Sequence, residues 1–178
     1  MNMTGFLSGK RKCLLAIAVA FSTFGNAQLA TYPAGLDTGM PHNDDYTVKV
    51  RQVGGEWKDV FEYEVHVDMD KVQSASMVQF DMGEPVEVMV KKNNGTIQDV
   101  KIRPLATGIQ HTVNSNVIYF TLTKPQYLSI EFNGDRLHNL HLFANPLETE
   151  TYTESRDNVM YFGPGIHLPK DLPNTEIR

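Results

Sequence analysis

Apolar side chains recur at every second position along much of the chain from Tyr46 onward, and this period limits the possible folds more than any other feature. In the segment 61–67, the odd positions carry Phe, Tyr or Val and the even positions carry Glu or His. A period of two places successive side chains on opposite faces of a β-strand. The pattern therefore predicts a half-buried strand with Phe61 and Val65 in the core and Glu62, Glu64 and His66 outside.

The same period predicts further strands, separated by segments rich in Gly, Asn and Pro that favour tight turns. Asn94-Gly95 is the strongest signal for a β-hairpin among these segments. No stretch of useful length shows the spacing of an amphipathic helix. We therefore expect an all-β fold, namely a single antiparallel, immunoglobulin-like β-sandwich over residues 46–147. The further predicted strands are Tyr46–Val50, Met77–Phe80, Val86–Val90, Val100–Ile102, Ile118–Leu122, Leu128–Phe132 and Leu140–Phe143.

Residues 1–27 have the features of a secretory signal peptide. The basic residues Lys10, Arg11 and Lys12 precede an apolar run over 13–24 and the small-residue segment Gly25-Asn26-Ala27. A membrane anchor is the alternative, but the run is shorter than the roughly 20 residues of a spanning helix. We expect cleavage after Ala27 and export of the product to the periplasm or the extracellular space. After cleavage, we expect no segment to anchor it in a membrane.

Charge and cysteine content restrict the partners and the stabilisation of the exported chain. Cleavage after Ala27 removes three positive charges and no negative ones, so the formal net charge falls from −5 to −8. An acidic surface repels nucleic-acid phosphates and anionic polysaccharides, which makes nucleic acid an unsuitable partner. The only cysteine, Cys13, leaves with the signal. The core must therefore stabilise the domain without disulfides.

The ends of the exported chain differ in composition from the sandwich. Residues 28–45 are predicted to form an N-terminal extension, and residues 148–158 are polar and charged without periodicity, as in a linker. A short apolar strand, Val159–Phe162, and the turn Gly163-Pro164-Gly165 follow. A single short strand needs a neighbouring layer. We expect 148–178 either to return to the sandwich edge or to begin a domain that this chain lacks.

Four strings in the sequence together resemble the N-terminal β-sandwich domain of bacterial exported glycoside hydrolases, of the dextranase (family 49) and polygalacturonase-like (family 28) types. In the enzymes of these families the sandwich precedes a catalytic right-handed parallel β-helix. The resemblance places Phe162–His167 at the junction between these two domains. The implied catalytic carboxylates would project from rungs of that β-helix, so the resemblance assigns no catalytic residue here. The strings are Asp44–Arg51, Gly55–Trp57, His138–Pro146 and Tyr161–His167.

Trp57 is the single tryptophan of the chain and the one candidate for contact with carbohydrate. Gly54-Gly55-Glu56 places it on a loop or a strand edge, with Phe61 and Tyr63 close in sequence. A flat aromatic ring can stack on the apolar face of a sugar. The alternative is that Trp57 covers an end of the sandwich or packs against another domain.

The remaining candidates for chemistry have simpler structural interpretations. The acid pair Asp44-Asp45 precedes a strand and the pair Asp68 and Asp70 follows one, positions at which acids usually form turns or solvated ends. His138 and His141 are three residues apart, which on a strand directs them to opposite sides. We therefore predict no catalytic residue, no metal site and no cofactor.

Two main functions follow from these observations. The first is a non-catalytic N-terminal module of a secreted polysaccharide-degrading glycoside hydrolase, in a truncated chain that lacks its catalytic β-helix. The second is a free-standing exported β-sandwich that binds a glycan or another protein. A complete small hydrolase that uses the acid pairs is a third, weaker hypothesis, because glycosidases need two carboxyl groups at defined separations across a groove.

Overall fold

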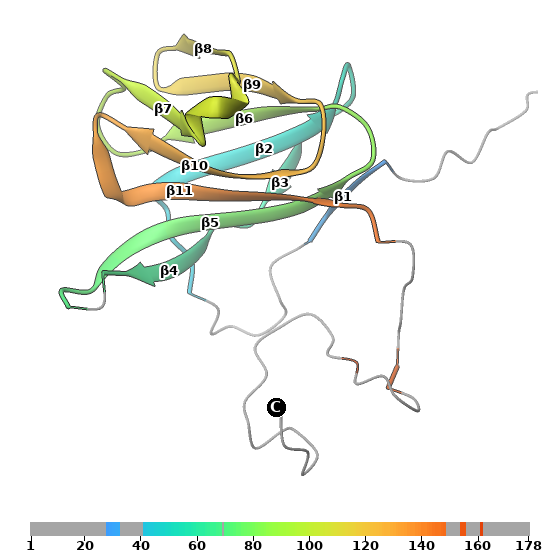
Figure 1. Cartoon of the computed structure of the whole chain (residues 1–178), viewed down its shortest axis with the longest axis horizontal. Coiled ribbons are helices and arrows are strands. Elements are labelled where there is room, and N and C mark those ends of the chain that lie inside the picture. Colours follow the sequence, from blue (N-terminus) through green and yellow to red (C-terminus); the bar gives the residue numbers. More distant parts are fainter. Residues whose placement is uncertain (1–27, 33–40, 69, 149–153, 156–160, 162–178) are drawn as a thin grey trace, which may run out of the picture.

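The computed structural model describes residues 28–32, 41–68, 70–148, 154–155 and 161, and within them two β-sheets pack face to face (Figure 1). The described residues form eleven β-strands and a short 3-10 helix, Leu105–Thr107. Both sheets are mostly antiparallel, which confirms the predicted all-β sandwich. Within this part of the chain, no helix has the length and apolar character needed to cross a membrane.

Five strands form the smaller sheet, sheet B, in the order β3-β2-β6-β9-β8. Neighbouring strands in it are antiparallel throughout. In its three central strands every second side chain is apolar and buried. The strands are β2 (Tyr46–Gln52), β3 (Lys58–Val60), β6 (Val86–Lys92), β8 (His111–Asn114) and β9 (Val117–Leu122).

Six strands form the larger sheet, sheet A, in the order β1-β5-β11-β10-β7, with β4 also paired to β5. β4 and β1 follow one another along the same edge of β5, pairing with its residues 73–77 and 80–82. The pair of β5 and β11 is parallel, so the sheet is not purely antiparallel. The strands are β1 (Leu29–Thr31), β4 (Tyr63–Val67), β5 (Gln73–Met82), β7 (Val100–Arg103), β10 (Gln126–Phe132) and β11 (Asp135–Pro146).

The hydrophobic core lies between the sheets and consists of the inward-facing side chains of both. Removal of this apolar area from water is the dominant stabilising contribution to such a fold. Because the core takes every second residue of the central strands, the residues between them form an outer face on each sheet. Side chains with no exposed surface include Val48, Val50, Val88 and Ile118 from sheet B, and Val78, Phe80, Ile130 and Leu142 from sheet A.

The prediction of one strand over 61–67 is wrong in its register and in its extent. Sheet B ends at Val60 in β3 and sheet A begins at Tyr63 in β4, so the chain changes sheets at Phe61-Glu62. Tyr63 pairs with Met77 on the outer face of sheet A, and Val65 on the same face is only half-buried. Glu62, expected in water, is only 8% exposed. His66 is exposed, as predicted.

The prediction of a hairpin at Asn94-Gly95 is also wrong. Gly95 has the expected positive φ of 75°, but β6 before it lies in sheet B and β7 after it lies in sheet A. The turn therefore belongs to an arch between sheets. A two-residue hairpin forms instead at Asn133-Gly134, where φ is 57° and 76° and Phe132 pairs with Asp135.

Near the ends of the chain, the structure adds a strand to the predicted sandwich. Leu29–Thr31 lies in the segment expected to be an extension, yet it pairs with β5 and Leu29 belongs to the core. The predicted signal peptide, the strand Val159–Phe162 and the turn Gly163-Pro164-Gly165 lie outside the described residues, apart from Tyr161.

Candidate functional site

An open groove of about 570 Å³ lies on the outer face of sheet B. It combines aromatic rings, hydroxyl and amide groups, and one pair of opposite charges. Four strands and the two loops beside them supply its walls. The residues that line it are Arg51, Trp57, Glu87, Val88, Gln110, His111, Thr112, Tyr119, Phe120 and Thr121.

The register of sheet B explains why these side chains meet. Glu87 of β6 lies opposite Arg51 on one side and Thr121 on the other. Tyr119 of β9 lies opposite Thr112 of β8. Residues directly opposite one another in an antiparallel pair share a face. The alternation that buries Val88 and Phe120 therefore aligns the polar and aromatic groups in rows on the other side.

Trp57 reaches the groove from the connection between β2 and β3. A turn at Gly54, where φ is 75°, and a hydrogen bond from the Gly55 N–H to the Gln52 carbonyl (2.8 Å) reverse the chain there. The Trp57 ring lies 6.3 Å from the Tyr119 ring, and the two planes are inclined by 53°. The loop thus brings Trp57 to a ring that is 62 residues away in sequence.

Arg51 contacts Trp57 and two acceptors at the same time. Its guanidinium carbon lies 4.3 Å from the centre of the Trp57 ring, in a cation–π arrangement. The Nε atom donates to Glu87 Oε2 at 2.6 Å, and Nη1 lies 3.5 Å from the Gly55 carbonyl oxygen. These contacts hold the arginine against the tryptophan and neutralise its charge within the groove.

The predicted site residue Trp57 therefore lies in the groove, but its neighbours differ from those expected. The Phe61 and Tyr63 rings meet edge to face, with centroids 4.8 Å apart, and Phe61 also contacts the His42 ring. Trp57 instead contacts Tyr119 and Arg51, which sequence proximity does not indicate. The sequence offered one signal for Tyr119. It lies between Ile118 and Phe120, and because these two side chains are buried, that of Tyr119 points to the outer face of the strand.

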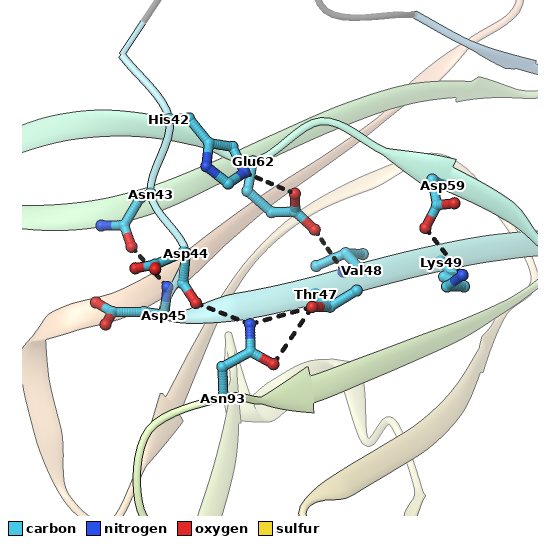
Figure 2. A network of polar contacts seen from close by, with 10 residues as sticks. All are labelled: His42, Asn43, Asp44, Asp45, Thr47, Val48, Lys49, Asp59, Glu62 and Asn93. Atoms are coloured by element: carbon cyan, nitrogen blue, oxygen red, sulfur yellow. Dashed lines mark hydrogen bonds and ion pairs between the residues drawn. The ribbon is translucent and has the colours of Figure 1, made fainter.

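The acid pair Asp44-Asp45 lies in a network of polar contacts that shapes the start of β2 (Figure 2). The Asp45 N–H donates to Asn43 Oδ1 at 2.9 Å, and the Asp44 carbonyl accepts from Asn93 Nδ2 at 2.8 Å. The Asp45 carboxylate accepts from Asn94 Nδ2 at 2.6 Å. These contacts match the turn role predicted for the pair.

Glu62 is the buried carboxylate of the same network (Figure 2). Its Oε1 accepts the Val48 N–H at 2.6 Å, and Oε2 lies 3.5 Å from His42 Nε2. Desolvation raises the pKa of Glu62, although the hydrogen bonds from Val48 and His42 oppose the shift. β3 ends at Val60, so no strand continues beside β2 past this point. The Glu62 carboxylate takes its place and accepts the backbone N–H of Val48 in β2.

The other predicted candidates also lie in turns or on strand faces. Asp68 has φ of 53° in the turn between β4 and β5, and its carboxylate accepts the Lys71 N–H at 3.4 Å. His138 pairs with Asp135 at 2.9 Å in the exposed first part of β11, whereas burial lowers the pKa of His141. Among the residues that the structure describes, no three acidic, His or Cys side chains gather as a metal site would require.

Comparison with known proteins identifies a similarity in fold. No protein-family model matches the chain, and no curated protein matches its sequence. Among solved structures, the chain resembles Dex49A from Penicillium minioluteum, a family 49 dextranase, with a TM-score of 0.55 and 16% sequence identity. The match covers 72% of this chain but only 35% of Dex49A, so the chain spans about a third of that enzyme's length. At this identity the likeness shows a shared fold alone.

Proposed function

We propose that this chain is the non-catalytic N-terminal module of an exported, polysaccharide-degrading glycoside hydrolase, and that the groove on sheet B contacts the polysaccharide. In such an enzyme a separate β-helix domain would carry the catalytic carboxylates. The fold similarity to one part of a dextranase supports this assignment, because the match leaves most of that enzyme's length uncovered.

The observation that carries the proposal is the groove around Trp57. Aromatic rings contact the apolar C–H faces of sugars, while hydroxyl and amide groups beside them bind the sugar hydroxyls. Trp57 and Tyr119 supply the rings, and Gln110, Thr112 and Thr121 supply the polar groups. The 53° inclination of the two rings suits a bent, soluble glycan chain better than a flat crystalline surface.

Affinity electrophoresis of the purified chain in gels that contain dextran or another soluble glycan tests the proposal. We expect the glycan to retard the chain, and Trp57→Ala to abolish the retardation. Tyr127→Ala is the matched control, because Tyr127 is also an exposed aromatic residue with a ring partner, Phe143, but lies on sheet A. A wild-type chain that no glycan retards would refute the binding role, and reducing-sugar release by the chain would refute the non-catalytic role.

A free-standing exported sandwich that binds glycan is the second candidate. It is favoured by the fact that strands and loops of this one sandwich supply every residue that lines the groove. The DNA downstream of the codon for Arg178 separates the two candidates. A β-helix coding sequence there, in frame or frameshifted, would support the module, and its absence would favour the free-standing protein.

A further inference from the structure

The groove on sheet B contains one arginine, and its surroundings bear on which glycans the groove can accept. An arginine beside an aromatic ring usually suggests a binding site for a carboxylate, since its planar guanidinium matches that group. Here the Nε atom of Arg51 already donates to Glu87 at 2.6 Å. Trp57 lies 4.3 Å from the guanidinium, and the Gly55 carbonyl is within 3.5 Å of Nη1.

The remaining lining residues add no further fixed charge to the groove. Apart from Arg51, Glu87 and His111, they are aromatic, aliphatic, hydroxyl or amide side chains. The nearby Lys49 is itself paired, with Asp59 at 3.1 Å. An anionic sugar entering the groove would therefore meet a neutralised cation and the carboxylate of Glu87, without an uncompensated lysine or arginine among the lining residues.

We propose that Glu87 is a specificity-determining residue that restricts this groove to uncharged glycans. This inference rests on the proposed function of the groove. Glu87 acts in two ways: it neutralises Arg51, and its own negative charge repels the carboxylates of a polyuronate. Neither effect weakens the binding of an uncharged glycan, because such a glycan binds through the Trp57 and Tyr119 rings and through hydroxyl contacts.

Removal of the Glu87 charge in the full chain provides the test. In affinity gels we expect dextran, but not polygalacturonate, to retard the wild-type chain at low salt. Glu87→Gln should gain affinity for polygalacturonate of about fivefold or more, since one like charge at close range costs on the order of 1 kcal/mol in water. About 0.5 M NaCl should abolish the gain, because salt screens exposed charges.

Three further variants make the result specific to the groove. Glu87→Met also removes the charge and should give the same gain if Glu87→Gln folds poorly. Arg51→Met combined with Glu87→Gln should reduce the gain, because no cation remains to attract the carboxylates of polygalacturonate. Glu131→Gln is the matched control, since Glu131 forms the equivalent pair with Arg103 on sheet A, and it should leave polygalacturonate binding unchanged.

The outcomes separate this inference from the function on which it rests. Equal retardation of the wild-type chain by dextran and polygalacturonate would overturn the role of Glu87 and leave glycan binding intact. Unchanged polygalacturonate binding by both Glu87 variants, with dextran binding retained, would overturn it as well. A wild-type chain that neither polymer retards would refute the proposed function itself.

Discussion

The two outer faces of the sandwich each carry an arginine–glutamate pair of the same length. Arg51 Nε lies 2.6 Å from Glu87 on sheet B, and Arg103 Nε lies 2.6 Å from Glu131 on sheet A. Their surroundings differ. The Glu131 side chain is only 6% exposed, whereas that of Glu87 is 31% exposed and lines a groove beside Trp57.

This difference shows that equal geometry does not imply an equal role. A buried carboxylate depends on its partner, because loss of the partner leaves a charge away from water. A half-exposed pair contributes little to stability but still determines the local charge that a ligand encounters. We therefore assign a mainly structural role to the pair on sheet A and a mainly electrostatic role to the pair on sheet B.

The largest effect is expected in the core that supports both faces. Phe80 has no exposed surface, so Phe80→Ala should lower the free energy of unfolding by about 3–5 kcal/mol in urea titrations. Because both sheets share this core, near-UV circular dichroism and tryptophan fluorescence should report a single transition. A loss below about 1 kcal/mol would show that Phe80 lies outside the main core.

The two glutamates themselves should differ in their effect on stability. Glu131→Ala should cost about 1–3 kcal/mol, since it empties a buried position and removes the acceptor of Arg103. Glu87→Ala should cost less than about 1 kcal/mol, as is usual for a solvent-accessible pair. Urea titrations of both variants measure the difference. Equal losses would contradict the division of roles between the two faces.

Glu62 extends the comparison to a buried carboxylate with no arginine partner. Glu62→Leu should cost about 1–3 kcal/mol because the Val48 N–H loses its acceptor. Glu62→Gln retains a side-chain carbonyl for that N–H and should cost less. A larger loss for Gln than for Leu, in the same urea titrations, would contradict the acceptor role.

Glu62 should also make stability depend on pH. Its pKa is raised in the folded state above the ordinary value of 4.5, mainly by desolvation. The folded protein therefore holds this proton more tightly than the unfolded chain does. The resulting stability is complete below the ordinary pKa and is lost as pH rises through the folded pKa. In melts at increasing pH, Glu62→Gln should lose less stability over this range than the wild type.

The smallest effect is a change in the fluorescence of Trp57. As the single tryptophan of the chain, it reports directly on the groove. Glu87→Gln should increase quenching of its emission by acrylamide, because Arg51 is then held less firmly against the ring. Glu131→Gln on sheet A should leave the quenching unchanged. The same response in both variants would indicate a general loosening of the fold.

The strands that could be predicted from the sequence are those that keep one register within one sheet. Every second residue of β6 and β9 is apolar and buried, as predicted for Val86–Val90 and Ile118–Leu122. The segment 61–67 alternates equally well but crosses from sheet B to sheet A, and the period continues through the crossing. Alternation records which side chains share a face of a strand, and it does not record which sheet the strand joins.

Of the residues that line the groove, the sequence singled out one, Trp57, and its contact with carbohydrate stays a prediction. Composition singled it out, because it is the single tryptophan and follows two glycines. Its partners Arg51, Glu87 and Tyr119 come from three different strands of sheet B. Only the register between those strands brings them together, and register depends on packing of the opposite face against the core.

The sequence by itself determined that this chain forms an all-β sandwich, because a period of two is compatible with half-buried strands and with little else. It also determined which strand positions carry aromatic and charged side chains. Tertiary structure alone decided that Glu62 is buried and that Glu87 meets Arg51 beside Trp57. Both outcomes depend on contacts between residues distant in sequence, and such contacts arise only once the two sheets have paired their strands and closed on the core.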